Sequence, residues 1–234
     1  MQQTAPILIT GASQRIGLHC AKSFLAQGQP VIITYRKLRP AVAELEQLGA
    51  ICLQADFSSG SSIEAFIQLL HQHCSKLRAI IHNASAWLDD EPGQQPMQQL
   101  FNVHVLAPYL INLACEPLLR QCASADIIHI GDDVTRRGSS KRIAYSASKA
   151  ALENMSMSFA ARFAPQIKVN CIAPALIMQQ DGDNPDYLQQ ATDKSVMRSI
   201  PGAQVVFEAI KYLLESPYTT GITLPLNGGR HLKN

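Results

Sequence analysis

The chain has 234 residues, of which 47% are hydrophobic and 16% are charged, and its formal net charge is +2. This length suits one α/β domain with a sizeable core. A net charge this close to zero does not indicate a nucleic-acid or acidic-membrane partner. No apolar run is long enough to span a membrane, and the N-terminus lacks a signal-peptide pattern, so we expect a cytoplasmic protein. The six scattered cysteines indicate core positions in a reducing compartment and no metal site.

Apolar runs typical of strands alternate with amphipathic segments along the chain. The pattern predicts an α/β protein, a Rossmann-type doubly wound, mostly parallel seven-stranded sheet with helices on both faces. Residues 1–234 would form one domain. The expected strands are 6–10, 30–35, 50–55, 78–82, 125–130, 167–172 and 221–225, and the expected helices are 14–27, 40–48, 60–74, 96–121, 144–163 and 203–215.

The first expected strand ends in the sequence Thr10-Gly-Ala-Ser-Gln-Arg-Ile-Gly17. A glycine-rich turn between a strand and a helix offers backbone N–H groups and the positive end of the helix dipole to a pyrophosphate. Arg15 stands where a middle glycine is usual. The turn therefore predicts a dinucleotide site, and an ordinary βα turn is the alternative.

The second expected strand ends in Tyr35-Arg36-Lys37. An acidic residue at this position would bind the ribose 2′-hydroxyl of NAD, whereas cations suit the 2′-phosphate of NADP. A guanidinium can pair with phosphate through two hydrogen bonds and stack on adenine. We therefore expect NADPH as the cofactor; the alternative is that both cations are solvated loop charges.

Tyr145 and Lys149 are spaced so that their side chains share one face of a helix. A nearby ammonium stabilises a phenolate and lowers the pKa of the phenol from about 10. Tyr145 would then donate a proton to a group that receives hydride. Asp132 lies upstream, where a hydroxyl residue would be usual, and the adjacent Asp133 should face the other way. The alternative is that Tyr145 and Lys149 share an ordinary amphipathic helix by chance.

The two motifs, in this order and at this separation, resemble the short-chain dehydrogenase/reductase family over nearly the whole chain. Further matches are Asp56 after the third strand, Asn83-Ala84-Ser85 after the fourth, 170–174 after the sixth and Gly228-Gly229 near the end.

Within that family the chain is similar to the pteridine reductases. The marks are Arg15 in the glycine-rich turn, Asp132 in place of the usual Ser, and Trp87 just past 83–85. An indole beside the expected nicotinamide could stack on a flat heteroaromatic ring; core packing is the alternative for Trp87.

The resemblance implies the residues of a site at the carboxyl ends of the strands. His104 stands at the position of the family's usual Asn; it would order a water near Lys149 or simply fill space, with Asn102 as the fallback. The catalytic candidates are Tyr145, Lys149, Asp132 and His104. The cofactor candidates are Gly11, Ser13, Arg15, Ile16, Gly17, Tyr35, Arg36, Lys37, Asp56, Phe57, Asn83, Ala84, Lys149 and Pro174. The substrate candidates are Arg15, Ser85, Trp87, Asp132 and Tyr145.

The implied activity is NADPH-dependent reduction of 7,8-dihydromonapterin to its tetrahydro form, with dihydrofolate and dihydrobiopterin as weaker substrates. Two alternatives stay open: a carbonyl reductase of the 3-oxoacyl type, and a non-catalytic NADP(H)-binding sensor. The resemblance also implies a homotetramer packed through the long helices, and a substrate lid around 175–199, where the alternation of strand and helix breaks down.

Overall fold

The computed structural model describes residues 4–179, 182 and 184–233. In this part of the chain seven strands form one sheet in the order β3-β2-β1-β4-β5-β6-β7, and every neighbouring pair is parallel. The predicted fold class is confirmed. The strands are β1 Ile7–Ile9, β2 Val31–Tyr35, β3 Ile51–Gln54, β4 Ala79–His82, β5 Ala125–Ile130, β6 Ile167–Pro174 and β7 Thr223–Leu226.

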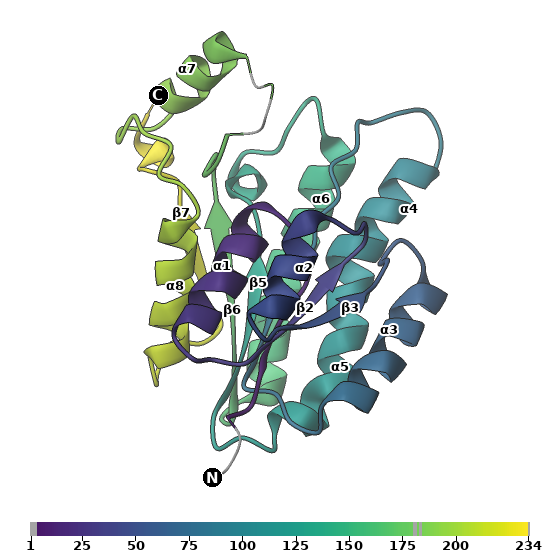
Figure 1. The fold of residues 1–234 in the computed structure, drawn as a ribbon. Coiled ribbons are helices and arrows are strands. Elements are labelled where there is room, and N and C mark those ends of the chain that lie inside the picture. The colour runs from purple at the N-terminus through teal and green to yellow at the C-terminus, as the bar shows by residue number, and fades with distance from the viewer. Residues whose placement is uncertain (1–3, 180–181, 183, 234) are drawn as a thin grey trace.

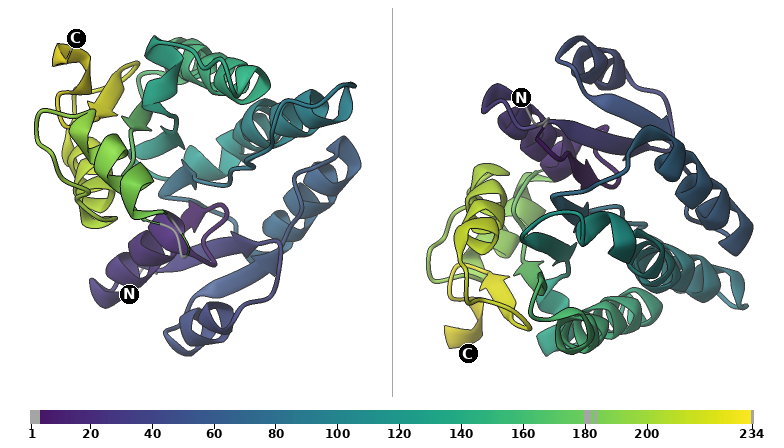
Figure 2. Two further views of the ribbon diagram at one scale, coloured as in Figure 1. Left: turned by 90° about the horizontal axis from the view of Figure 1, so that it is seen from above. Right: turned by 90° about the horizontal axis from the view of Figure 1, so that it is seen from below.

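Helices cover both faces of the sheet, as Figures 1 and 2 show. One layer contains α1, α2 and α8, and the other contains α3, α4, α5 and α6. None of the described helices is both long and apolar enough to cross a membrane. The helices are α1 Arg15–Ala26, α2 Pro40–Gln47, α3 Gly60–His73, α4 Gln95–Phe101, α5 Ala107–Leu119, α6 Ile143–Phe163, α7 Pro185–Asp193 and α8 Gln204–Glu215.

The central strands are buried on both faces, which explains the uninterrupted apolar run of β1 and the largely apolar sequences of β2 and β4. Side chains of a strand point alternately to its two faces. Leu8 of β1 accordingly joins the core beneath α3, α5 and α6, whereas Ile7 and Ile9 join the core beneath α1 and α8. The two cores hold the sheet rigidly between the helical layers, so the ends of the strands are fixed relative to one another.

The expected helix 96–121 is wrong as one continuous α-helix. It consists of α4, a π-helix over Asn102–Leu106, and α5. Single π-helical turns within α-helices are frequent at functional sites. Here His104 lies in the π-helical turn and is only 1% exposed.

The segment after β6 contains α7, a helix that the sequence pattern did not predict. No residue of α7 is buried, and its nine residues contain few apolar side chains, so the apolar pattern from which helices are recognised is short here. Asn184 caps its first turn by accepting a hydrogen bond from the backbone N–H of Asp186. Figure 1 shows α7 beyond the carboxyl ends of the strands, beside the C-terminal segment.

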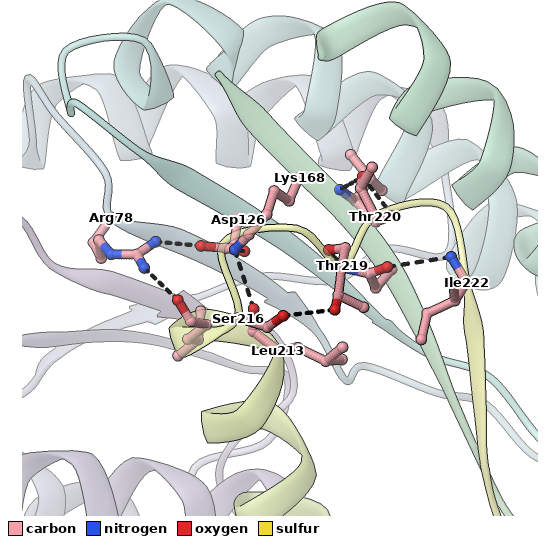
Figure 3. A network of polar contacts seen from close by, with 11 residues as sticks. Arg78, Asp126, Lys168, Leu213, Ser216, Thr219, Thr220 and Ile222 are labelled. Carbon is pink, nitrogen blue, oxygen red and sulfur yellow. Dashed lines mark hydrogen bonds and ion pairs between the residues drawn. The ribbon is translucent and has the colours of Figure 1, made fainter. Parts of the chain in front are cut away.

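A buried ion cluster holds the opposite end of the sheet together (Figure 3). Asp126 of β5, only 1% exposed, pairs with Arg78 at 2.5 Å and with Lys168 of β6. The two cations also donate to the carbonyls of Leu214 and Leu213, near the C-terminal end of α8. Cations are favourable at that end of a helix. The cluster therefore fixes α8 against β5 and β6 without contributing to the edge where the site lies.

Candidate active site

The glycine-rich turn after β1 packs directly against the end of β4. Gly11 has φ +65°, and a Cβ atom there would lie 2.7 Å from Cα of Ala84. The Asn83 side chain donates hydrogen bonds of 3.0 Å to the carbonyls of Thr10 and Gly11. At Gly17, a Cβ atom would lie 2.5 Å from Nδ2 of the same Asn83. Only glycine fits at either position, as close backbone packing requires.

Two threonines complete this junction, and neither is among the predicted site residues. Oγ1 of Thr10 accepts hydrogen bonds of 3.0 Å from the backbone N–H groups of Asn83 and Ala84. Oγ1 of Thr34, at the end of β2, accepts from the N–H of Gly11 at 2.9 Å. Both hydroxyls are buried. The sequence could have indicated both threonines, because a hydroxyl side chain at the end of a buried strand needs a hydrogen-bond partner.

The expected cofactor residues lie along one edge of the sheet, at the carboxyl ends of β1, β2, β3, β4 and β6. Arg15 begins α1 with φ +53°, which is uncommon for a residue other than glycine. Its guanidinium reaches the carbonyl of Met178 at 3.5 Å. Arg36 and Lys37 are exposed just beyond β2. The other residues of this edge are Ser13, Ile16, Tyr35, Asp56, Phe57 and Pro174.

These residues fit a dinucleotide. Gln14, the N-cap residue of α1, makes no side-chain capping hydrogen bond, so the N–H groups of the first turn are left for a pyrophosphate. Exposed cations follow β2, where an adenosine 2′-phosphate would lie. Oδ1 of Asp56 caps the turn after β3 by accepting from the N–H of Ser58 at 3.0 Å, and its exposed carboxylate retains capacity for an adenine amino group.

Tyr145, Asp132 and Lys149 come together at the ends of β5 and α6. The Tyr145 hydroxyl donates to Oδ2 of Asp132 at 2.8 Å, and Oδ1 of Asp132 accepts from the N–H of Val134 at 2.8 Å. Nζ of Lys149 donates to the carbonyl of Ile130 at 2.8 Å and lies 5.8 Å from the centre of the Tyr145 ring. The carboxylate is thus held by the backbone, and it in turn orients the phenol.

The expected lowering of the Tyr145 pKa is wrong for this arrangement. Burial raises the pKa of the phenol, and the Asp132 carboxylate raises it further by its charge and its hydrogen bond. The weaker opposing influences are the Ser85 hydroxyl and the Arg142 cation. Burial also lowers the pKa of Lys149, while Asp132 acts in the opposite direction. The Asp132 carboxylate thus favours the charged form of Lys149 and the protonated form of Tyr145.

His104 uses both ring nitrogens. Its Nε2 accepts a hydrogen bond from the N–H of Ala86 at 3.1 Å and lies 2.9 Å from the Ser85 hydroxyl. This assigns the proton to Nδ1, which donates to Oγ of Ser148 at 2.8 Å. Ser148 donates in turn to the carbonyl of Tyr145. Burial, and to a lesser extent Lys149, holds the pKa of His104 far below its usual range, so the ring is neutral.

His104 therefore joins the loop after β4 to the first turns of α6. Asn102, the fallback candidate, donates instead to the carbonyl of Ser58 at 2.6 Å and is directed away from Tyr145. Asp133 also faces away: it pairs with Arg137 at 2.5 Å and accepts from the Asn227 side chain at 2.7 Å. Of the two neighbouring aspartates only Asp132 meets the phenol, as the alternation of side-chain direction predicts.

Trp87 lies at the mouth of this group. It is 61% exposed, which excludes the core-packing alternative. Its ring centre lies 4.6 Å from that of Tyr145, and the Arg142 guanidinium lies 4.4 Å from the indole centre. A large exposed aromatic ring held by a cation beside a buried phenol is a surface on which a flat ring can stack.

The doubly wound sheet and the tyrosine–lysine pair at its carboxyl edge are those of a Rossmann-type nucleotide-binding protein. Residues 5–184 match the short chain dehydrogenase family, and the chain belongs to that family.

Named relatives give a finer comparison. The chain is 52% identical to the dihydromonapterin reductase of Klebsiella pneumoniae subsp. pneumoniae, over 99% of either chain. It is 49% identical to the dihydromonapterin reductase of Citrobacter koseri, over 99% of this chain and 98% of the other. Among solved structures, FolM alternative dihydrofolate reductase 1 from Brucella canis, complexed with NADP, has a TM-score of 0.89 at 23% identity, covering 98% and 95% of the two chains. The last similarity is one of fold.

Proposed function

We propose that the protein reduces 7,8-dihydromonapterin to 5,6,7,8-tetrahydromonapterin with NADPH, and reduces dihydrofolate and dihydrobiopterin more weakly. The observation that carries the proposal is the Tyr145–Asp132 hydrogen bond beside the exposed indole of Trp87. Full-length similarity to dihydromonapterin reductases supports it. A carbonyl reductase of this family generally presents a hydroxyl where this chain has Asp132, so the carboxylate disfavours that alternative.

The roles of the residues follow from their positions. Tyr145 donates the proton at pterin N5, because its raised pKa keeps the phenol protonated until the substrate accepts charge. Asp132 fixes the direction of the phenol. Trp87 and Arg15 hold the pterin ring, Trp87 by stacking and Arg15 by its charge. Ser85 lies beside the pterin edge, next to His104.

The cofactor residues bind and orient NADPH, which supplies the hydride when bound. In the described part of the chain, the buried Lys149 ammonium has one hydrogen-bond acceptor, the carbonyl of Ile130, so it has N–H groups left for the nicotinamide ribose. Arg36 and Lys37 bind the 2′-phosphate, and Asp56 accepts from the adenine amino group.

We further propose that residues 1–234 act as one domain in which 175–199 is the substrate lid. Residues 180, 181 and 183 of this segment lie outside the described residues. The Arg15 contact with Met178 links the lid to the nucleotide turn. Partly exposed side chains such as Tyr109 and Met157, on the outer faces of α5 and α6, are compatible with a homotetramer packed through these helices. A cytoplasmic location is consistent with the six free cysteines.

The test is NADPH oxidation by the purified protein with four substrates in parallel: dihydromonapterin, dihydrobiopterin, dihydrofolate and an acetoacetyl thioester. NADH replaces NADPH as the control. We expect the fastest turnover with dihydromonapterin and NADPH. Turnover of the thioester alone would make the protein a carbonyl reductase, and tight NADPH binding without any turnover would make it a sensor.

Tyr145→Phe tests the proton donor. The substitution removes the hydroxyl and leaves the ring against Trp87, so binding of NADPH should be unchanged. Turnover should fall by roughly 10²- to 10⁴-fold, the usual contribution of a positioned acid. Turnover near that of the wild type would remove Tyr145 from the mechanism.

A further inference from the structure

The helix that carries Tyr145 begins without a cap of its own. Its N-cap residue, Arg142, makes no side-chain capping hydrogen bond, and a guanidinium has no acceptor to offer the free N–H groups of the first turn. Lys141 and Arg142 also place two positive charges at the positive end of the helix dipole. Since Tyr145 is the third residue of α6, any fraying of this end moves the phenol.

The missing cap comes from a distant loop. Asp90 accepts hydrogen bonds from the N–H of Ile143 at 2.6 Å and from the N–H of Ala144 at 3.1 Å, one with each carboxylate oxygen. The first N–H that bonds within the helix is that of Ser146, which donates to the carbonyl of Arg142, so the N–H groups of Ile143 and Ala144 depend on Asp90. A carboxylate at this place satisfies two donors and also neutralises the dipole.

The loop that supplies Asp90 also carries Trp87. Asp89 pairs with Arg142 at 2.6 Å, and the same guanidinium lies over the Trp87 ring. The Trp87 ring in turn contacts Tyr145. On its other side, the loop borders an open hollow of about 420 Å³, lined mostly by residues 88–96 themselves. The loop is thus fixed by its contacts with α6 more than by core packing.

We propose that Asp90 is a positioning residue that fixes the substrate-stacking ring to the proton-donating helix. By capping α6 it holds Trp87 and Tyr145 as one unit, so the distance between indole and phenol is set before substrate arrives. The proposal rests on the proposed pterin reduction for its effect on catalysis. Its structural part, the dependence of the environment of Trp87 on Asp90, does not.

The experiment compares Asp90→Ala, Asp90→Asn and Ser59→Ala. Ser59 caps α3 by accepting from the N–H of Ser62, and its hydrogen bonds are to residues of α3, so Ser59→Ala is a matched loss of a helix cap. Trp87 is the only tryptophan of the chain, so intrinsic emission and its quenching by acrylamide report this ring alone. The other measurements are the KM for the dihydropterin, the Kd for NADPH and the Tm.

For Asp90→Ala we expect red-shifted and more easily quenched Trp87 emission, a rise of about fivefold in the KM for dihydropterin, and an unchanged Kd for NADPH. Asp90→Asn should recover part of both effects, because an amide oxygen accepts one of the two N–H groups without the charge. Ser59→Ala should lower the Tm and leave emission and KM unchanged.

The proposal is overturned if the emission and KM of the Asp90 variants change no more than those of Ser59→Ala at a comparable loss of Tm. Should Asp90→Ala fail to fold, the comparison of Asp90→Asn with Ser59→Ala decides. If the wild type turns over no dihydropterin, the emission data still test the contact, so failure of the proposed function and failure of this inference are distinguishable.

Discussion

The Tyr145 hydroxyl donates its hydrogen bond to Asp132, whereas the Lys149 ammonium donates to the carbonyl of Ile130 and lies 5.8 Å from the centre of the phenol ring. A carboxylate partner and an ammonium partner have opposite effects on a phenol. The carboxylate opposes ionisation of the phenol, and after burial it is the largest reason why the pKa of Tyr145 lies above its ordinary value. Tyr145, the proposed proton donor, is consequently a weak acid whose position is fixed by its hydrogen bond to Asp132.

Replacing Asp132 by Asn should shift the alkaline limb of the pH–rate profile to lower pH. The amide removes the negative charge that raises the Tyr145 pKa but keeps an oxygen near the hydroxyl. The phenol would then lose its proton at lower pH, and a deprotonated Tyr145 cannot donate. The measurement is kcat against pH for wild type and Asp132→Asn. An alkaline limb that stays in place would show that Asp132 does not control the ionisation of Tyr145.

Removing the guanidinium at position 36 should weaken the preference for NADPH over NADH. A hydrogen bond to a charged group contributes about 1.5–3 kcal/mol, so Arg36→Ala should raise the KM for NADPH by roughly 10- to 100-fold. The KM for NADH should hardly change, because NADH lacks the 2′-phosphate. Arg39→Ala is the matched control: this arginine is exposed in the same segment before α2. Equal effects of both variants would indicate a general charge effect without a specific phosphate contact.

Adding one methyl group at Gly11 should destabilise the protein more than the same change at Gly28. Both glycines have positive φ, +65° and +74°. Such a conformation costs an alanine about 1–2 kcal/mol. A Cβ atom at Gly28 meets nothing within 4 Å, whereas at Gly11 it lies 2.7 Å from backbone Cα of Ala84. Denaturant unfolding should give Gly28→Ala the smaller loss and Gly11→Ala the larger one. Gly11→Ala should also bind NADPH more weakly.

The stability of the protein should fall as the pH drops below about 6.5. His82 is buried, its Nε2 lies 2.7 Å from Oδ1 of Asn112, and its ring stacks on that of His129. Burial lowers the pKa of His82 from 6.5 to about 4, and burial also lowers the pKa of His129, so both rings are neutral in the folded state. The unfolded chain therefore binds more protons below about pH 6.5, and acid favours unfolding.

For His82 alone the loss amounts to about 2 kcal/mol by roughly pH 5 and about 3 kcal/mol by roughly pH 4. Denaturant unfolding of the wild type across this range measures the slope. His82→Gln should be less stable at neutral pH but should show a shallower slope. His71→Gln is the control, since His71 is exposed on α3. A slope unchanged in His82→Gln would place the acid sensitivity elsewhere.

The fold could be predicted because its central strands are buried on both faces, so that a strand such as Ile7–Ile9 appears as an uninterrupted apolar run. The glycines and cations that follow directly after β1 and β2 led to the prediction of a nucleotide site at this edge, and the structure places them together there. The Asp90 cap could not be predicted. It acts on Ile143, 53 residues further along the chain, and nothing local distinguishes Asp90 from its acidic neighbours.

The pKa of Tyr145 illustrates a second limit. The spacing of Tyr145 and Lys149 correctly predicts a shared helix. It does not show which charge lies nearest the hydroxyl, and that depends on the direction in which the loop after β5 turns Asp132. The helix α7 escaped prediction because it is only nine residues long, with few apolar side chains and no buried residue, so its apolar pattern is too short to recognise.

The π-helix over Asn102–Leu106 has a consequence for the helices on either side of it. One additional residue in a turn rotates everything that follows by about 100°. Because of this offset, α4 directs Leu100 toward Tyr145, while α5 directs Ile111 into the core beneath the sheet. A single-residue deletion here would shorten the chain very little, yet it would turn one of these two surfaces away from its partner. The rotation of α5 relative to α4 about the helix axis is therefore more tightly constrained than the length of the two helices.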